Sequence, residues 1–214
     1  MIRAIEKYNL TAENIYNWDE KGFLIRLCRA LKRIMTRQAY ESGRVKQAVQ
    51  DGSREFISLL ACVSAIGRRL PAALIYKGEG FDLQDTWVED LEDTDEAYFG
   101  ASSNGWSNDA FGLKWLVQVF DRHTRRLAGH RRRLLIVDGH SSHVNMAFLN
   151  KCDELRILVL ILPPHSTHRL QPLDVGLFQP LSTAYSQEVN NFLTKGLGMV
   201  SMTKRRFWSL FLPA

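Results

Sequence analysis

Residues 134–143, LLIVDGHSSH, place four aliphatic side chains directly before Asp138 and a cluster of polar side chains directly after it. A continuous apolar run of this length is typical of a central strand that is covered on both faces. Strand-end residues in α/β sheets gather at one edge, where ligand sites form. We therefore expect a buried strand at 133–138 that delivers the Asp138 carboxylate to a functional site.

The segments on either side of this strand alternate between strand and helix patterns. The first three expected strands read as an antiparallel meander, with Gly22 as a bend or hairpin turn and Gly67 as a tight turn. The first expected helix has Ser107 or Asn108 as its N-cap, and Pro180 should kink the last helix or mark its restart. Expected strands are 14–27, 54–67, 69–78, 133–138 and 156–164, and expected helices are 107–124, 145–155 and 174–193.

This order, β-β-β-α-β-α-β-α, predicts an α/β fold: a mixed sheet of three antiparallel strands followed by parallel strands, flanked by helices. The 214 residues suit one domain, and 45% hydrophobic with 24% charged residues is ordinary globular composition. Three scattered cysteines indicate reduced thiols. The aliphatic run at 157–162 is too short to cross a bilayer, and the N-terminus has no apolar core of signal-peptide length, so we expect no membrane partner.

Charge is distributed unevenly along the chain, whose net charge is +5. Residues 79–96 hold nine acidic side chains and no basic one, whereas 122–133 hold six arginines and no acidic one. Such polarity suits a surface that meets an anion on one side, although two mutually compensating solvated faces would give the same pattern. Arginine binds phosphate through paired hydrogen bonds. The candidate nucleic-acid contacts are Arg125, Arg126, Arg131, Arg132 and Arg133.

Three aspartates stand out by their place in this arrangement. Asp19 lies within the first expected strand, Asp138 ends the fourth, and Asp174 opens the last helix. If they converge, their carboxylates repel one another unless a cation lies among them, and Mg²⁺ or Mn²⁺ prefers such oxygen ligands. Ordinary turn or N-cap roles remain the alternative for each. Glu20 competes with Asp19, but neighbours on a strand face opposite ways, so only one of them can serve.

Three blocks, IYNWDEKGF, LLIVDGHSSH and LPPHSTHRLQPLDVGLF, closely resemble the signature blocks of pogo-type DDE transposases of the mariner-like superfamily, especially those abundant in fungal genomes. The resemblance covers nearly the whole chain and implies a ribonuclease-H-like fold with an Asp-Asp-Asp triad at Asp19, Asp138 and Asp174. The 35 residues between the last two (174 − 138 − 1) are consistent with such elements. It also implies DNA cleavage and strand transfer with two Mg²⁺ or Mn²⁺ ions, DNA as partner, a homodimer as in related transposases, and a nuclear location.

The histidines raise a competing hypothesis. Two H-x-x-H pairs, at 140–143 and 165–168, supply enough nitrogens to hold zinc. Both pairs lie in loops rich in serine and proline, whereas zinc pairs usually occupy a helix or a rigid knuckle. We therefore expect them to flank the carboxylates and to contact phosphate or orient ligands. The residues concerned are His140, His143, His165 and His168.

The chain also departs from the family pattern. Only 13 residues precede position 14, so the usual N-terminal helix-turn-helix region is not expected, and the usual catalytic domain continues beyond position 214. We expect residues 1–214 to form a single DDE catalytic domain truncated at its C-terminus. Two functions fit: a metal-dependent DNA endonuclease and strand-transfer domain, or a domesticated or degenerate nucleic-acid-binding protein without turnover.

Overall fold

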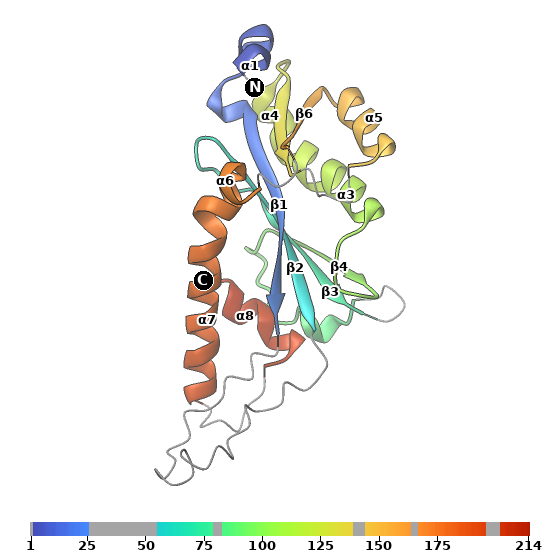
Figure 1. The fold of residues 1–214 in the computed structure, drawn as a ribbon. Coiled ribbons are helices and arrows are strands. Elements are labelled where there is room, and N and C mark those ends of the chain that lie inside the picture. Colours follow the sequence, from blue (N-terminus) through green and yellow to red (C-terminus); the bar gives the residue numbers. More distant parts are fainter. Residues whose placement is uncertain (1, 26–54, 79–82, 139–143, 164–166, 196–201) are drawn as a thin grey trace.

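A six-stranded mixed sheet forms the centre of the computed structural model, which describes residues 2–25, 55–78, 83–138, 144–163, 167–195 and 202–214 (Figure 1). Its strand order is β4-β3-β2-β1-β5-β6. The strands are β1 (Ile15–Leu24), β2 (Phe56–Ser64), β3 (Ala72–Lys77), β4 (Ala97–Ser102), β5 (Arg133–Val137) and β6 (Ile157–Ile161).

The strand directions confirm the predicted mixed sheet. β1, β2 and β3 form the antiparallel meander, and β5 and β6 add in parallel beside β1. β4, which the sequence did not predict, pairs in parallel with β3. Gly100 in β4 leaves the space that the Phe111 ring occupies, because a Cβ there would lie 2.5 Å from that ring. Pairing with β3 and packing against Phe111 therefore explain this edge strand better than its own residue types do.

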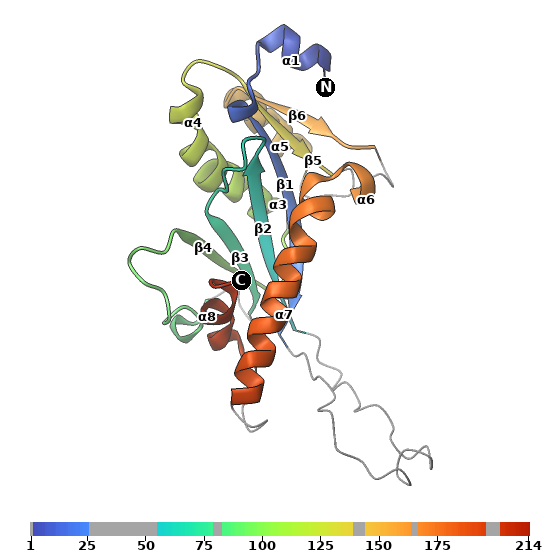
Figure 2. The ribbon, with the colours of Figure 1, turned by 90° about the vertical axis from the view of Figure 1, so that its left-hand side faces the viewer.

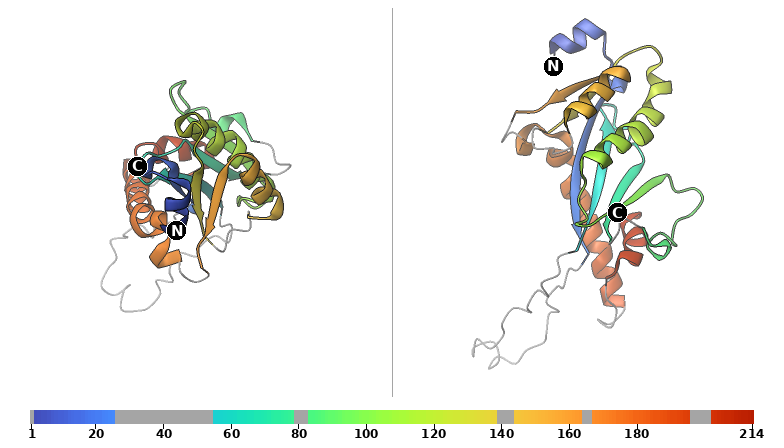
Figure 3. Two further views of the ribbon diagram at one scale, coloured as in Figure 1. Left: turned by 90° about the horizontal axis from the view of Figure 1, so that it is seen from above. Right: turned by 90° about the vertical axis from the view of Figure 1, so that its right-hand side faces the viewer.

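Helices cover both faces of the sheet (Figures 2 and 3). The helix predicted at 107–124 is a continuous one with a π-helical middle, and its N-cap is Asn108, whose side chain accepts from the Phe111 amide at 3.1 Å. Pro180 lies just after the π-helical residues 173–177, inside a helical run that continues from 172 to 195, so no helix starts at Pro180. The helices are α1 (Ile2–Tyr8), α3 (Asp109–Trp115), η4 (Leu116–Asp121, π), α4 (Arg122–Ala128), α5 (Met146–Glu154), α6 (Thr167–Leu170), η5 (Leu173–Leu177, π), α7 (Phe178–Lys195) and α8 (Phe207–Phe211), with single 3₁₀ turns η1 (Ala12–Asn14), η3 (Asp85–Trp87) and η6 (Lys204–Arg206). Within the described ranges, none of these helices has the length and apolar character needed to span a bilayer.

The two faces of β1 serve different purposes. Trp18 points toward α3 and α5, where its ring stacks on Trp115 at a centroid distance of 4.3 Å and on Phe148 at 5.7 Å. Side chains alternate along a strand, so Asn17 and Asp19 point to the opposite face. Toward the far end of β1 that face carries Phe23, which packs with the aromatic residues of α7 and α8. The stacked rings therefore anchor β1 from behind while Asp19 faces the other way.

Gly22 lies inside β1 and not in a turn, which corrects the expectation of a bend or hairpin there. It pairs with Ser58 of β2, and a Cβ at this position would lie 2.9 Å from the Trp106 ring. The glycine is therefore explained by the close approach of an aromatic side chain. The Gly67 turn is confirmed: its φ is +83°, and its amide donates to the Ser64 carbonyl at 2.9 Å.

The acidic segment is neutralised in part by the C-terminal residues. Arg205 pairs with Glu89, Arg206 lies 3.8 Å from Asp90, and the Trp208 indole donates to Asp95 at 3.0 Å. These contacts join two regions more than a hundred residues apart in the sequence. Basic residues of the chain itself therefore compensate part of the negative charge of the acidic segment.

Arg133 forms a buried ion pair, and this removes it from the predicted set of DNA contacts. Its Nη1 lies 2.9 Å from an Asp121 carboxylate oxygen and donates to Thr124 Oγ1 at 2.9 Å, while Nη2 donates to the Leu155 carbonyl. The side chain is only 3% exposed. We therefore assign Arg133 to the fold, where it ties η4 and α4 to β5.

Removing the acidic partner should expose the importance of this pair. Asp121→Ala leaves the Arg133 guanidinium buried without its counter-charge, and we expect a loss of roughly 3–5 kcal/mol in the free energy of unfolding. Arg125→Ala is the matched control: Arg125 contacts the same carboxylate at 3.6 Å but is 74% exposed, so the expected change is at most about 1 kcal/mol. Urea denaturation measures both, and equal losses would contradict the assignment.

Candidate active site

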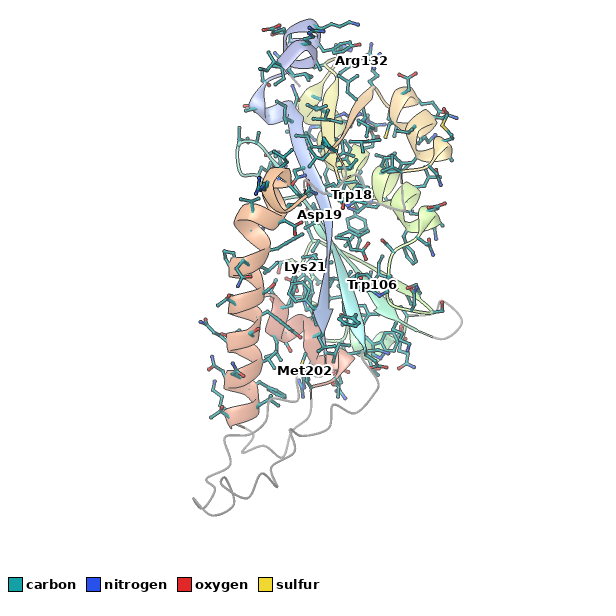
Figure 4. The ribbon with its side chains drawn as sticks, viewed as in Figure 1. Trp18, Asp19, Lys21, Trp106, Arg132 and Met202 are labelled. Atoms are coloured by element: carbon teal, nitrogen blue, oxygen red, sulfur yellow. The ribbon has the colours of Figure 1, made fainter. Side chains whose placement is uncertain are left out.

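The pairing of β1 with β5 brings the first two predicted aspartates to the same level of the sheet. The parallel register aligns Ile15 with Leu134 and Asn17 with Ile136. Two residues further along each strand, this alignment sets Asp19 beside Asp138. Partners in a parallel pair point to the same face. Figure 4 shows Asp19 about halfway along β1.

The third aspartate approaches through the π-helical turn η5. Asp174 is the second residue of this turn, and the Leu173 amide directly before it donates to Asn17 Oδ1 at 3.0 Å. Asn17 lies two residues before Asp19 on the same face of β1. The turn that carries Asp174 is therefore fixed against the face that carries the other two aspartates.

The Asp174 and Asp138 carboxylates both act electrostatically on Asp19. The pKa of Asp19 is raised to about 7, chiefly by burial and to a lesser extent by repulsion from Asp174 and Asp138, while hydrogen bonds from the Glu20 amide and the Gln171 side chain act to lower it. The Glu20 amide donates to Asp19 Oδ1 at 2.8 Å. The structure thus brings Asp19, Asp138 and Asp174 into one electrostatic unit.

The donor set fits a hard divalent cation. All three groups offer carboxylate oxygens, and a cation among them would relieve the repulsion that raises the Asp19 pKa. Over the described ranges, no group of three or more His, Cys, Asp or Glu side chains, the three aspartates included, is placed closely enough to hold a metal ion between them. An open arrangement is compatible with Mg²⁺, which keeps several water ligands and is bound by one or two carboxylates together with substrate phosphates.

Glu20, the rival of Asp19, is engaged on the other face of β1. Its carboxylate accepts from the Ser107 amide at 3.3 Å and from the Ser107 hydroxyl. This contact fixes the residue that precedes the N-cap of α3. Glu20 therefore holds the start of α3, and Asp19 is left as the acidic residue on the face of Asp138.

Two buried amides lie at the centre of the site, and the sequence did not single them out. Asn17 Nδ2 donates to the Ile136 carbonyl at 3.1 Å and to Gln171 Oε1 at 2.9 Å. Gln171 Nε2 donates to the Trp18 carbonyl at 3.1 Å. The signal available in the sequence was position alone, because Asn17 stands two residues before Asp19 and Gln171 three before Asp174.

Lys21 is a second residue that the sequence did not single out. It follows Asp19 by two positions and so shares its face of β1, and its ammonium lies 5.7 Å from the centre of the Phe178 ring at the start of α7. Lys21 therefore places a positive charge on the same face of β1 as Asp19, two residues further along the strand.

The predicted arginines lie away from the carboxylates. Arg125, Arg126 and Arg131 are exposed, and Arg132 lies over the Tyr8 ring at 5.4 Å. Arg131 and Arg132 directly precede β5, whereas Asp138 follows it, so the five residues of β5 separate these two arginines from Asp138 by roughly 16 Å. Figure 4 shows Arg132 well away from Asp19. We call Arg125, Arg126, Arg131 and Arg132 the arginine surface.

The predicted histidine contacts fall largely outside the described residues. His140, His143 and His165 lie outside the described ranges. For His168 the structure describes only the backbone, within α6. The zinc and phosphate hypotheses for these histidines therefore stay predictions.

Comparison with known proteins gives the site a family context. The family model described as DDE superfamily endonuclease matches residues 53–207. A Cochliobolus lunatus protein named MFS-type transporter clz9 is 33% identical over 208 residues, which are 97% of this chain and 21% of that protein. The human pogo transposable element with KRAB domain is 25% identical over 156 residues, 72% of this chain and 24% of that protein. The chain thus spans about a fifth to a quarter of these relatives.

Solved structures match the fold. A pre-cleavage Mos1 transpososome aligns with a TM-score of 0.53 at 16% identity, over 99% of this chain and 56% of that one. The Mos1 transposase catalytic domain determined with Raltegravir and Mg aligns with a TM-score of 0.51 at 14% identity, over 99% and 82%. The predicted ribonuclease-H-like fold is confirmed.

The raised pKa of Asp19 predicts a pH-dependent stability. Between about pH 4 and pH 7 the folded protein retains a proton that the unfolded chain releases, so stability falls as pH rises through this window. Asp19→Asn removes this penalty while keeping the Oδ1 acceptor. At pH 8 without divalent metal we expect the variant to be more stable by about 2–4 kcal/mol, with a melting temperature several degrees higher.

Melting curves at pH 4 and pH 8 measure this difference. At pH 4 the two proteins should melt nearly alike, because Asp19 is protonated in the folded state and only about half ionised in the unfolded chain. Asp93→Asn, at an exposed position in the acidic segment, is the control and should change little at either pH. A stabilisation by Asp19→Asn that is equal at both pH values would contradict the electrostatic origin.

Proposed function

This chain belongs to the DDE superfamily endonucleases, as a transposase domain of the pogo and mariner type, and on that basis we propose that it cleaves DNA and transfers strands with a divalent metal. The proposal draws on one observation above all: Asp19, Asp138 and Asp174 share one face of the sheet, where burial, and to a lesser extent repulsion from the other two carboxylates, raises the pKa of Asp19. An uncompensated cluster of like charges is what a metal-dependent phosphoryl-transfer site requires before its cation and its substrate bind.

In this proposal the three aspartates are the ligands of Mg²⁺ or Mn²⁺, in a two-ion site. Bound ions would activate the attacking water or 3′-hydroxyl and neutralise charge that develops on the phosphodiester. Asp19 belongs to β1 and Asp138 directly follows β5, the strand paired with β1. Asp174 approaches the same face of the sheet from η5. Lys21 is placed to contact a substrate phosphate. The related Mos1 catalytic domain determined with Mg supports the choice of metal.

We propose DNA as the partner, bound partly through the arginine surface at the other end of β5. Guanidinium groups at exposed positions match backbone phosphates and add a salt-dependent, sequence-independent affinity. A homodimer is proposed by analogy with the Mos1 paired-end complex. A nuclear location follows from the DNA substrate, and we take residues 1–214 as one catalytic unit.

A DNA-binding protein without turnover is the second candidate. The separation of the arginine surface from the carboxylates favours it, because DNA affinity could persist after catalysis is lost. The two candidates differ in one measurement. An active enzyme nicks DNA only when metal is present, whereas the alternative binds DNA in a salt-sensitive way and leaves it intact.

Replacing each aspartate by asparagine tests the enzymatic proposal. Nicking of supercoiled plasmid with Mn²⁺ or Mg²⁺ should fall about 10³-fold or more in Asp19→Asn, Asp138→Asn and Asp174→Asn, because each loses a charged ligand of the metal. Asp93→Asn, at an exposed position in the acidic segment, should cut like the wild type. Metal-dependent nicking that survives Asp138→Asn would refute the assignment, and its absence in the wild type would favour the second candidate.

The arginine surface predicts a specific change in salt dependence. Each arginine that contacts a phosphate contributes about 0.9 to the slope of log K against log salt concentration. Arg126→Ala combined with Arg131→Ala should therefore flatten the slope by about 2. Arg205→Ala, which removes a positive charge that is paired with Glu89, is the control and should leave the slope nearly unchanged. Fluorescence anisotropy with a labelled duplex measures both.

A further inference from the structure

Asn17 and Gln171 join the three chain segments that carry the aspartates. Asn17 itself belongs to β1, its Nδ2 reaches the Ile136 carbonyl of β5, and its Oδ1 receives the Leu173 amide of η5. Ile136 stands two residues before Asp138, and Leu173 one residue before Asp174. A single carboxamide thus contacts all three segments within two residues of each acid.

Gln171 completes this arrangement from the side of η5. Its Oε1 accepts from Asn17 at 2.9 Å, its Nε2 donates to the Trp18 carbonyl at 3.1 Å, and its side chain also hydrogen-bonds the Asp19 carboxyl group. The Trp18 carbonyl belongs to the peptide unit that leads into Asp19. Gln171 therefore fixes both the backbone and the side chain of Asp19.

Both amides are buried and fully satisfied. Asn17 is 4% exposed and Gln171 is fully buried. Asn17 uses both N–H groups and its oxygen, and Gln171 uses its oxygen and its N–H groups. Neither a carboxylate nor an apolar side chain of similar size offers these donors and acceptors together. A polar network of this kind fixes one arrangement of the segments it joins, because partial breakage leaves buried groups unpaired.

We propose that Asn17 and Gln171 are positioning residues for the carboxylate site: they hold β1, β5 and η5 in the one relative arrangement in which the three aspartates bind a divalent cation together. The inference rests on the proposed function, because it assumes that the aspartates take up metal. Loss of the two amides should weaken metal binding by more than the accompanying loss of stability explains.

Metal affinity is the readout, measured as Mn²⁺ binding by isothermal titration calorimetry on the whole chain without DNA. Gln171→Met keeps the length of the side chain and removes its hydrogen bonds. Asn17→Ser is a milder second variant, because the serine hydroxyl can still form a hydrogen bond. It keeps the test usable if Gln171→Met does not fold well. We expect each to bind Mn²⁺ about 10-fold or more weakly, as is typical when groups that orient metal ligands are removed.

Thr124→Val supplies the matched control. Thr124 is fully buried and bonds the Phe120 carbonyl and Arg133, so its replacement also breaks buried hydrogen bonds, but at the other end of β5. Its melting temperature should fall as in the amide variants, while Mn²⁺ affinity stays at the wild-type value. The double variant Asn17→Ser/Gln171→Met should lose less than the product of the single losses, because either change already opens the network.

The outcomes distinguish a failure of the positioning role from a failure of the proposed function. Wild-type affinity in folded Gln171→Met and Asn17→Ser overturns the positioning role and leaves the proposed function standing. An equal loss of affinity in Thr124→Val overturns it as well, since the effect would then follow stability alone. If the wild-type chain binds no Mn²⁺ and cuts no DNA, the proposed function fails, and this inference fails with it.

Discussion

The short parallel ladder between β1 and β5 is the constraint on which the rest of the site depends. It runs from Ile15 to Asn17 on one strand and from Leu134 to Ile136 on the other. Asp19 and Asp138 come just beyond its end, at the same level and on the same face. Parallel strands require a crossover connection. The chain between them accordingly builds the rest of the meander, β4 and the α3–η4–α4 helix before it returns as β5.

The two faces of β1 have opposite effects on stability: the Asp19 face is electrostatically unfavourable, and the Trp18 face is well packed. Burial and repulsion oppose ionisation of Asp19, as its raised pKa records. On the other side Trp18 lies between Trp115 and Phe148 in a stack of aromatic rings. Large buried aromatic side chains contribute strongly to stability. The core thus holds β1 in place although its outward face carries a destabilising charge, a combination that recurs at functional sites.

The sequence predicted those features that depend on local pattern and on strand alternation. The apolar run before Asp138, the meander and the helix with its Asn108 cap were all legible, and alternation correctly separated Asp19 from Glu20. Features that depend on tertiary contacts were not. Arg133 looks like its neighbours in a run of arginines until Asp121, twelve residues earlier, is found beside it inside the protein. Contacts with residues distant in the sequence likewise explain Gly22, β4 and the pair Asn17–Gln171, so the local sequence could not predict them.

Charge placement extends the same reasoning to the surface. The contacts of Arg205 and Arg206 with the acidic segment lie near α8, so these cations are committed within the chain. The arginine surface lies beyond the opposite end of the sheet, near α1. Roughly 16 Å of β5 separate it from Asp138, which corresponds to about five base pairs of duplex at about 3.4 Å each. Under the proposed function, a duplex that contacts both surfaces must continue about half a turn beyond the scissile phosphate, so DNA affinity and cleavage should have separate length requirements.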